Sequence, residues 1–383
     1  MHREEIKLLK ILQVTNDLYP EVVGGIPLYV HHLCRDLSRM GYYTTVLACS
    51  RSNHGHAKID DYNVVYHKIL FSPLGNSFSP HIFRTLLKIR DDYDLIHAHC
   101  HLFLSTIMAS LVRRIGSPPL IITTHGIMSA SAPDWFNLLY MKTIGKWTLK
   151  SADKIVCHTQ MEKDKLVDML KIDSEKISVI PNGVNIKLFH PDSDTDNRNN
   201  PSNAITILWV GRFVRGKGIK YIIHAAKILA KEVPDFKILL VGDGPSKGEI
   251  EGLVKKFNLD KNVIIKENVP NENMPEMYQK SDIFVLPSLN EGVPNTLLEA
   301  MACGKPVIIS DFPHLEELIK NAGLTFPKGD VHALADRIMR LIRDKESAKE
   351  LGNNGRNKIV EDHSWGNTVR KTIELYEEVV GRK

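Results

Sequence analysis

Residues 283–309 read IFVLPSLNEGVPNTLLEAMACGKPVII and contain every part of one strand–helix–strand unit. Apolar runs at Ile283–Leu286 and Pro306–Ile309 flank a segment of helical periodicity at Thr296–Cys303, which Pro294 opens. The apolar runs lack polar alternation, so we expect both strands to be buried on both faces. This is typical of a parallel sheet that helices cover on either side.

The same alternation extends along most of the chain. In the first half, strands are expected at Leu8–Val14, Thr44–Cys49, Val64–Ile69, Leu95–Ala98, Leu120–Thr124, Lys154–Cys157 and Ile177–Ile180, with a well-marked helix at Pro27–Met40. In the second half, further strands are expected at Ile205–Val210, Lys237–Val241 and Val263–Ile265, and the last helices at Val331–Arg343, Lys345–Val360 and Trp365–Val380. Since parallel strands are joined by right-handed crossovers, the pattern predicts α/β domains of the doubly wound, Rossmann-like type.

Residues 190–204, HPDSDTDNRNNPSNA, interrupt this alternation. They contain almost no apolar side chains and are rich in Pro, Asn, Asp and Ser, which is typical of an exposed linker. We therefore predict a first domain over 1–189, a linker over 190–204, a second domain over 205–363, and a C-terminal helix over 364–383 that packs back on the first domain. The two domains are expected to face a central cleft, with ligands at the carboxyl ends of the strands.

The composition excludes several classes of protein. The 383 residues are 43% hydrophobic and 25% charged, so the chain is neither disordered nor collagen-like. Residues 1–190 hold 22 Lys and Arg against 17 Asp and Glu, which accounts for the whole net charge of +5. This excess is too small for a nucleic-acid binder. Five scattered cysteines, the lack of a secretory signal in Met1–Lys10 and the lack of a long apolar span predict a cytoplasmic protein.

Glu291 and Glu299 flank the start of the helix in the opening segment. Because a helix N-terminus presents free N–H groups and a partial positive charge, it suits a diphosphate. The two carboxylates could each hold sugar hydroxyls on either side of that diphosphate. Spacing alone equally allows that they only complement the helix dipole.

This segment resembles the E-x7-E signature of the retaining glycosyltransferases of family 4, which have the GT-B fold. The similarity continues through Ala300–Val307. Further matches occur in the family's order at Gly24-Gly25, His125-Gly126, Pro181–Asn185, Gly211-Arg212, Lys217-Gly218 and Gly242–Pro245. The resemblance thus covers essentially the whole chain.

The resemblance implies a role for each matching residue. Arg212 and Lys217 would neutralise the diphosphate of the donor, Glu291 would bind the hydroxyls of the donor sugar, and Glu299 would bind the ribose. His125 would contact the donor sugar through its backbone carbonyl or its imidazole. The remaining donor-binding residues would be Gly24, Gly25, Gly242, Asn295, Thr296 and Leu297, with Thr296 and Leu297 offering backbone N–H groups to the phosphate. The catalytic set would be His125, Glu291, Arg212 and Lys217, with no metal and no cofactor.

We therefore predict a hexosyltransferase-type enzyme that moves a sugar from a UDP- or GDP-sugar to a glycan or lipid-linked acceptor hydroxyl, with retention and an α-linkage. The departing phosphate would accept the proton of the acceptor, so no separate base is required. A nucleotide-sugar epimerase on the same fold and an inactive glycan-binding or scaffold protein are the alternatives.

Two other motifs suggest ligands. His97, His99 and His101 alternate at the end of an expected strand and could hold a metal, but they match the family's D-x-x-H-x-H strand end instead. Lys142, Lys146, Lys150 and Lys154 recur every four residues beside Trp135, Phe136, Tyr140 and Trp147. Such a stripe is either a solvated face or a peripheral contact with an anionic membrane on its inner face.

Overall fold

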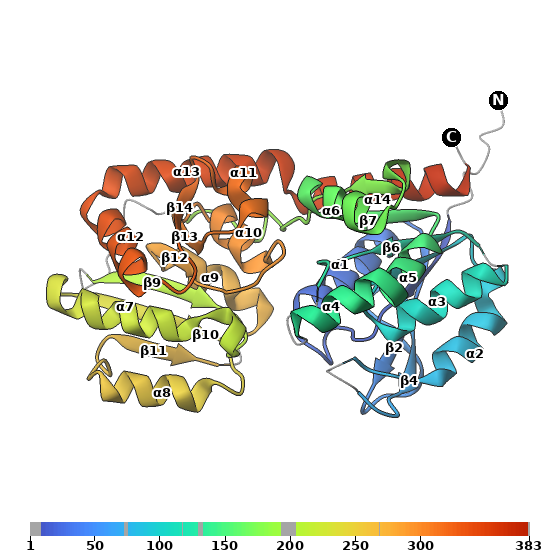
Figure 1. Ribbon diagram of the computed structural model, residues 1–383, viewed down its shortest axis with the longest axis horizontal. Coiled ribbons are helices and arrows are strands. Elements are labelled where there is room, and N and C mark those ends of the chain that lie inside the picture. Colours follow the sequence, from blue (N-terminus) through green and yellow to red (C-terminus); the bar gives the residue numbers. More distant parts are fainter. Residues whose placement is uncertain are drawn as a thin grey trace. The chain divides into compact units, whose positions relative to one another are not determined.

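The structure is a computed structural model of the chain and describes residues 9–72, 76–116, 118–128, 133–192, 204–267 and 269–381. It divides into two compact units (Figure 1). The first is Met1–Pro181 together with Thr368–Lys383, and the second is Asn182–Asn367. Each unit is built around one sheet, and the two are described separately.

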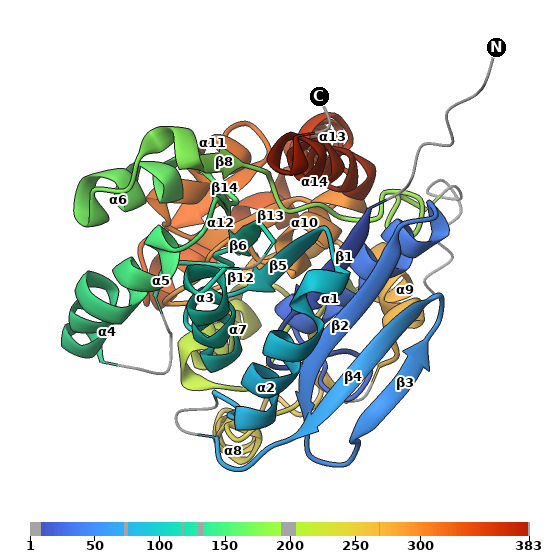
Figure 2. The ribbon, with the colours of Figure 1, turned by 90° about the vertical axis from the view of Figure 1, so that its right-hand side faces the viewer.

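The described part of the first unit forms an eight-stranded sheet in the order β3-β4-β2-β1-β5-β6-β7-β8. Its strands are β1 (Lys10–Val14), β2 (Tyr43–Ser50), β3 (Gly55–Ile59), β4 (Tyr62–Lys68), β5 (Leu95–His99), β6 (Leu120–Thr123), β7 (Lys154–Cys157) and β8 (Ile177–Val179). Its helices are α1 (Gly25–Arg39), α2 (Pro80–Ile89), α3 (Leu104–Arg114), α4 (Asp134–Tyr140), α5 (Lys146–Lys150), α6 (Gln160–Leu170) and most of α14 (Trp365–Val380). A π-helical turn, η3 (Met141–Gly145), joins α4 to α5. Only β3 runs antiparallel among these strands, along β4 (Figure 2).

The two faces of this sheet differ in polarity because side chains alternate along each strand. Leu12 and Val14 of β1 and Ile96 and Ala98 of β5 belong to an apolar core that α2, α3, α5 and α6 complete. The residues between them, Gln13, His97 and His99, point to the other face, where Tyr376 of α14 contacts Gln13 and His97. The alternation thus places a buried polar group under the last helix.

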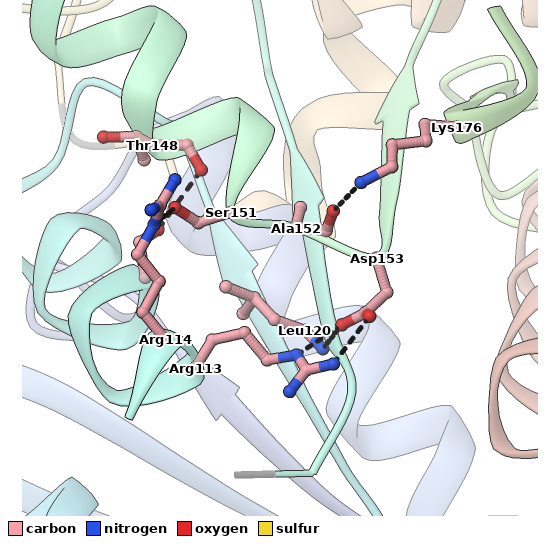
Figure 3. Close-up of polar contacts among 9 residues, drawn as sticks. Arg113, Arg114, Leu120, Thr148, Ser151, Ala152, Asp153 and Lys176 are labelled. Carbon is pink, nitrogen blue, oxygen red and sulfur yellow. Dashed lines mark hydrogen bonds and ion pairs between the residues drawn. The ribbon is translucent and has the colours of Figure 1, made fainter. Parts of the chain in front are cut away.

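Asp153 ties three elements of the first unit together at the start of β7 (Figure 3). Its carboxylate accepts two hydrogen bonds from the Arg113 guanidinium of α3, at 2.7 and 2.8 Å, and one from the Leu120 N–H at 2.8 Å. Such bidentate pairing fixes direction as well as distance. It therefore sets where β6 begins beside β7.

The described part of the second unit forms a six-stranded parallel sheet in the order β11-β10-β9-β12-β13-β14. Its strands are β9 (Ile205–Val210), β10 (Phe236–Val241), β11 (Val263–Lys266), β12 (Ile283–Leu286), β13 (Val307–Ser310) and β14 (Gly323–Phe326). Its helices are α7 (Ile219–Glu232), α8 (Lys247–Lys256), α9 (Met274–Gln279), α10 (Asn295–Ala302), α11 (Glu316–Ile319), α12 (Val331–Arg343) and α13 (Lys345–Asp362).

Both faces of the second sheet are apolar. One face packs against α7, α8 and α12, and the other against α9, α10, α11 and α13. On β12, Ile283 and Val285 face the first set and Phe284 and Leu286 face the second. Burial on both sides explains why these strands are continuous apolar runs.

The structure differs from the sequence prediction at the edges of the sheets. β3 and β14 were not predicted, because β3 is an exposed polar strand and β14 is only four residues long. Both form only because a neighbouring strand supplies their hydrogen bonds. The first helix begins at Gly25, two residues before the proline that was expected to open it.

The domain boundaries also differ from those expected. Residues 182–189, predicted to end the first domain, belong to the second unit. Val184 pairs with Ser364 there, and Phe189 packs in the core beside α9 and α10. From Thr368 onward the last helix belongs to the first unit. Residues 193–203 of the expected linker lie outside the described residues.

Candidate functional site

The carboxyl ends of β9, β10 and β12 lie side by side in the second sheet, and two glycines allow the loops there to approach closely. Gly218 and Gly242 have φ values of 68° and 140°. A Cβ at Gly218 would lie 2.0 Å from the Pro287 carbonyl oxygen, and one at Gly242 would lie 1.9 Å from that of Gly211. Only glycine fits such positions. The Leu289 N–H also donates to the Gly216 carbonyl at 2.8 Å, so the loops after β9 and β12 are bound together.

Lys217 and Glu291 meet where these loops join. The Lys217 Nζ lies 2.6 Å from the Glu291 Oε1, which also accepts a hydrogen bond from the Ser288 hydroxyl at 2.7 Å. The Glu291 side chain is only 8% exposed, against 32% for Lys217. This geometry holds one carboxylate and one cation at the end of β12, each with capacity for further hydrogen bonds.

The first turn of α10 begins four residues after Glu291. The Asn295 side-chain oxygen accepts a hydrogen bond from the Asn182 amide. The Leu297 N–H donates to the Pro294 carbonyl at 3.1 Å, whereas the N–H groups of Asn295 and Thr296 have no backbone acceptor among the described residues. Two amides at this helix start are thus open to a ligand. Leu297, which was predicted to offer its N–H to the phosphate as well, donates that N–H to the Pro294 carbonyl in the free protein.

Glu299 lies one turn further along α10. Its Oε2 accepts a hydrogen bond from the buried Tyr278 hydroxyl at 2.6 Å. Burial raises the pKa of the Glu299 carboxyl to about 7. The group therefore changes charge near neutral pH, unlike an ordinary surface glutamate.

The other predicted site residues are divided between the two units. Arg212 is exposed and, within the described part of the chain, its side chain makes no hydrogen bond or ion pair. Gly24 and Gly25 begin α1 in the first unit, and a Cβ at Gly24 would make only an ordinary contact, 3.6 Å from Pro27. The internal packing therefore does not require glycine at position 24.

His125 follows β6 in a left-handed conformation, with φ 52°. Both of its ring nitrogens lie next to other histidines: Nε2 is 3.1 Å from His99 Nδ1, and Nδ1 is 3.3 Å from His158 Nε2. The Tyr29 ring of α1 packs edge-on against it, with centroids 4.8 Å apart. Burial holds the pKa of His125 well below its usual range, so the ring is neutral.

Sequence reasoning missed the partners of the predicted residues. Ser288, Tyr278 and Asn182 support Glu291, Glu299 and Asn295, and Tyr29 and His158 surround His125. Only Asn182 carried a signal, because it lies in the Pro181–Asn185 match. The others come from separate elements that spacing along the chain does not connect.

The three alternating histidines do not share one face. β5 ends at His99, and Cys100 turns the chain with φ 64°, so His101 contacts Met141 on the opposite side. His97 instead bonds to Tyr376 and Thr123. Among the described residues, no group of three or more His, Cys, Asp or Glu side chains is arranged to hold a metal ion.

The basic stripe is shorter than expected. Lys154 lies in β7 and pairs with Glu378 at 2.9 Å, and Trp147 packs under the Arg114 guanidinium. Lys142 and Lys150 are exposed, and so is Trp135 at the start of α4. Within the described ranges, every helix is too short or too polar to span a bilayer.

Two family models match the chain, one for each unit. The model described as Glycosyltransferase Family 4 matches residues 23–188, and the model described as Glycosyl transferases group 1 matches residues 192–358. Together they cover most of the sequence, and they meet close to the boundary between the two compact units.

Known proteins with the same arrangement are glycosyltransferases. The UDP-Gal:alpha-D-GlcNAc-diphosphoundecaprenol alpha-1,3-galactosyltransferase of Escherichia coli is 28% identical over 312 residues, which are 78% of each chain. Sucrose-phosphate synthase from Thermosynechococcus elongatus superposes with a TM-score of 0.82 at 25% identity, covering 98% of this chain and 100% of that one. HepE of Anabaena, solved in complex with UDP, has the same fold, with a TM-score of 0.78 at 19% identity over 97% and 100% of the two chains.

These matches confirm the predicted fold class of two doubly wound α/β domains. The open amides and the paired Lys217 and Glu291 lie at the strand ends where a doubly wound sheet binds its ligand. The chain belongs to glycosyltransferase family 4, has the GT-B fold, and transfers a sugar from a nucleotide-sugar donor.

Proposed function

We propose that this protein is a retaining hexosyltransferase that uses a UDP-sugar and forms an α-linkage on a lipid-linked glycan acceptor. The observation that carries the proposal is the Lys217–Glu291 pair beside the open amides of Asn295 and Thr296. A diphosphate at the start of α10 would meet cations and N–H groups together, which is how proteins usually bind this group.

Binding of the donor would separate the pair. Lys217 would turn to the diphosphate, together with the exposed Arg212, and Glu291 would accept hydrogen bonds from the hydroxyls of the sugar. Glu299 would do the same for the ribose. Since Ser288 still donates to Glu291, that carboxylate keeps one partner when Lys217 leaves.

In the reaction, the bond between the anomeric carbon and the diphosphate oxygen would break as the acceptor oxygen bonds to that carbon on the same face. The proton of the acceptor hydroxyl would pass to the departing diphosphate. Lys217 and Arg212 would stabilise the negative charge on the leaving group, which is the largest contribution a protein makes to such a step. We propose that these cations act without a metal ion, so activity would persist in excess EDTA.

His125 would contact the donor sugar through its backbone carbonyl. The notion that its imidazole does so is less favoured, because both ring nitrogens already face histidines. Gly24, where the packing does not require glycine, together with Gly25 and Gly242, would give the donor close access to backbone. The first unit would bind the acceptor.

Two relatives support the choice of donor and acceptor. HepE was solved with UDP, and the Escherichia coli relative is named for UDP-Gal and for a diphosphoundecaprenol-linked sugar. We extend both chemistries to this chain: a UDP-sugar and a sugar carried on a polyprenyl diphosphate. The GDP-sugars that the family also allows are the alternative donors.

Titration with nucleotides tests the donor. Calorimetry with UDP, GDP and ADP is expected to show binding of UDP at least about tenfold tighter than that of the other two, a difference of about 1.4 kcal/mol. Equal binding of all three would contradict the choice of UDP. No binding of any of them would favour the scaffold alternative.

The stereochemistry requires a separate measurement. With a UDP-hexose and a polyprenyl diphosphate-linked sugar, proton NMR of the first product formed is expected to show the anomeric coupling of an α-linkage. A β-linked product would exclude retention. Conversion of the UDP-sugar into an epimer without acceptor would instead identify the epimerase alternative.

We also propose that the α4–η3–α5 surface makes a peripheral contact with anionic lipid. It combines exposed apolar side chains, Trp135 at 68% and Leu139 at 56%, with Lys142, Lys146 and Lys150. In flotation with phosphatidylglycerol vesicles, wild type is expected to rise with the lipid and a Lys142/Lys146/Lys150→Glu variant to stay behind. A Lys255/Lys256→Glu variant of α8 is the matched control, and equal flotation of all three would refute the contact.

A further inference from the structure

A continuous row of buried hydrogen-bonding groups crosses the polar face of the first sheet. We define this histidine network by its members in order: Thr123, His97, Tyr376, Gln13, His99, His125, His158 and the Ile180 carbonyl. The successive distances between their polar atoms are 2.7, 2.6, 3.1, 2.8, 3.1, 3.3 and 3.0 Å. The row brings together β1, β5, β6, the ends of β7 and β8, and α14.

One end of the network determines the direction of its hydrogen bonds. The Ile180 carbonyl can only accept, so the facing Nδ1 of His158 must carry a proton. If His158 is neutral, its Nε2 is an acceptor and the proton between it and His125 belongs to His125 Nδ1. By the same reasoning, His125 Nε2 accepts from His99 Nδ1.

Gln13 connects this half of the network to Tyr376. In the structure the Gln13 oxygen faces His99 Nε2 and the Gln13 amide nitrogen faces the Tyr376 hydroxyl. With His99 neutral and its proton on Nδ1, however, its Nε2 is an acceptor. The amide must then be turned by half a revolution, so that its N–H donates to His99 and its oxygen accepts from Tyr376. Beyond it, the Tyr376 oxygen accepts from His97 Nδ1, and Thr123 donates to His97 Nε2. Every donor then meets one acceptor, and all four histidines are neutral.

The amide orientation in the structure gives the opposite order of hydrogen bonds, and a half-turn of the Gln13 amide relates the two orders. Its oxygen and nitrogen have almost the same size, so the turn exchanges them without moving a neighbour. With the oxygen toward His99, as it is in the structure, each hydrogen bond from Thr123 to His158 must run the opposite way. His158 then needs an N–H on both nitrogens, so this second arrangement holds one extra proton and a positive charge.

Burial of three of the four rings favours the neutral arrangement. Burial lowers the pKa of His97 to about 3 and holds those of His99 and His125 well below the usual range. The titratable side chains that pack on the network, Tyr29 of α1 and His101 after β5, are uncharged near neutral pH. Glu162 of α6 acts in the opposite direction: its carboxylate accepts a hydrogen bond from the His158 backbone N–H at 2.8 Å, and a negative charge at this end favours a positive one.

We propose that Tyr376, acting through Gln13, is a positioning residue that determines which ring nitrogen of His125 carries the proton. In the neutral arrangement this is Nδ1, and both ring nitrogens of His125 are held. The held ring thereby fixes the left-handed backbone of His125, whose carbonyl lies just after β6. The C-terminal helix thereby controls a residue 251 positions earlier in the chain. The effect on catalysis rests on the proposed function, in which His125 contacts the donor sugar.

Two-bond proton–nitrogen NMR of the full-length, 15N-histidine-labelled protein tests the proposal, because it distinguishes the two ring nitrogens. At pH 7.5, wild-type His125 is expected to carry its proton on Nδ1. In Tyr376→Phe, the amide loses its donor and His125 should populate both tautomers. The matched control is Tyr62→Phe, which removes another buried hydroxyl bonded to a histidine, His31 at 3.0 Å, and should leave His125 unchanged.

A second variant keeps the test decisive if Tyr376→Phe does not fold. In Gln13→Glu, an ionised carboxylate can only accept, so His99 and His125 are forced to carry protons on Nε2 and the network takes up a proton. Wild-type His125 protonated on Nε2, or unchanged tautomers in every folded variant, would overturn the proposal.

Enzyme kinetics then test the link to catalysis. If the function is as proposed, Tyr376→Phe should lower kcat about tenfold while the affinity for UDP stays within about twofold, as expected for lost positioning rather than lost binding. The low-pH limb of its rate profile should also move to higher pH than in Tyr62→Phe. The tautomer measurement does not depend on enzyme activity. It therefore tests the role of Tyr376 even if the proposed function is wrong, and the kinetics test the proposed function separately.

Discussion

Both sheets carry polar side chains near the carboxyl ends of their strands, but they use them in opposite ways. In the second unit, Lys217 and Glu291 form one charged pair beside two amides that have no backbone acceptor in the described part of the chain. In the first unit, His97, His99, His125 and His158 bond mainly to one another and to Tyr376 and Gln13. The charged pair and the open amides of the second unit can still bind a charged ligand. The histidines of the first unit use their hydrogen-bonding groups within the protein and so fix the conformation of the loops around them.

The loops show the same contrast. After β9 and β10, the close turns are made by Gly218 and Gly242, which leave room for backbone contacts. After β5 and β6, the left-handed positions are occupied by Cys100 and His125. A side chain in this conformation costs free energy and persists only where its surroundings hold it. For His125, the hydrogen bonds of its ring to His99 and His158 stabilise this conformation.

The largest expected effect is at the charged pair. Replacing Lys217 by Ala should lower kcat/KM about 100- to 1000-fold, because the departing diphosphate loses a cation. Release of UDP in the presence of acceptor measures it, and Lys220→Ala, an exposed lysine that packs on Tyr221, is the matched control. A loss of less than about threefold would show that the pair is structural.

Gly218→Ala tests the close approach in the same loop. Because a Cβ there would meet the Pro287 carbonyl at a positive φ, the unfolding free energy should fall by at least about 2 kcal/mol. Urea unfolding measures the change. Gly216→Ala, where an added Cβ meets nothing within 4 Å, should change stability by less than about 0.5 kcal/mol. Equal effects would mean that the turn adapts to a side chain.

The pH dependence of stability should have opposite signs in the two regions. His97 has a folded pKa of about 3 against 6.5 when exposed, so below pH 6.5 the unfolded chain binds the proton and stability falls as pH falls. Its contribution is about 1.4 kcal/mol per pH unit. Glu299 has a folded pKa of about 7 against 4.5, so its contribution to stability rises as pH falls from 7 to 4.5.

Hydrogen exchange between pH 7.5 and 5.5, corrected for its intrinsic rate, measures both regions in one sample. Protection of β5 and β6 should decrease, and protection of α10 should hold or increase. If protection of β5, β6 and α10 fell by the same amount, the two regions would not differ in the sign of their pH dependence, and the contrast between them would be wrong.

The smallest effect concerns Glu299 alone. Glu299→Gln keeps the shape of the side chain and removes its charge, so at pH 8 the free protein should melt a few degrees higher than wild type. The same variant should bind UDP about tenfold more weakly if the carboxylate holds the ribose. Tyr278→Phe, which removes only the partner hydroxyl, separates the two effects. Unchanged UDP affinity in Glu299→Gln would remove the ribose role.

Much of the fold was predictable because buried parallel strands are continuous apolar runs. The runs at Ile205–Val210 and Ile283–Leu286 coincide with β9 and β12. Strands such as β3 were not predictable, because their stability comes from a neighbouring strand rather than from their own residues. The boundary at residue 182 was missed for a related reason: Val184 pairs with Ser364, which is far away along the chain.

The sequence by itself determined the fold class, the family and the positions of Lys217, Glu291 and Glu299, because these depend on local periodicity and on short motifs. Only the tertiary structure decided that Lys217 and Glu291 pair, that Tyr278 contacts Glu299, and that the imidazole of His125 is enclosed by other histidines. Such contacts join residues from separate strands and helices, and only the packing of these elements sets which side chains meet. The same packing sets their burial, which raises the pKa of Glu299 and lowers that of His125.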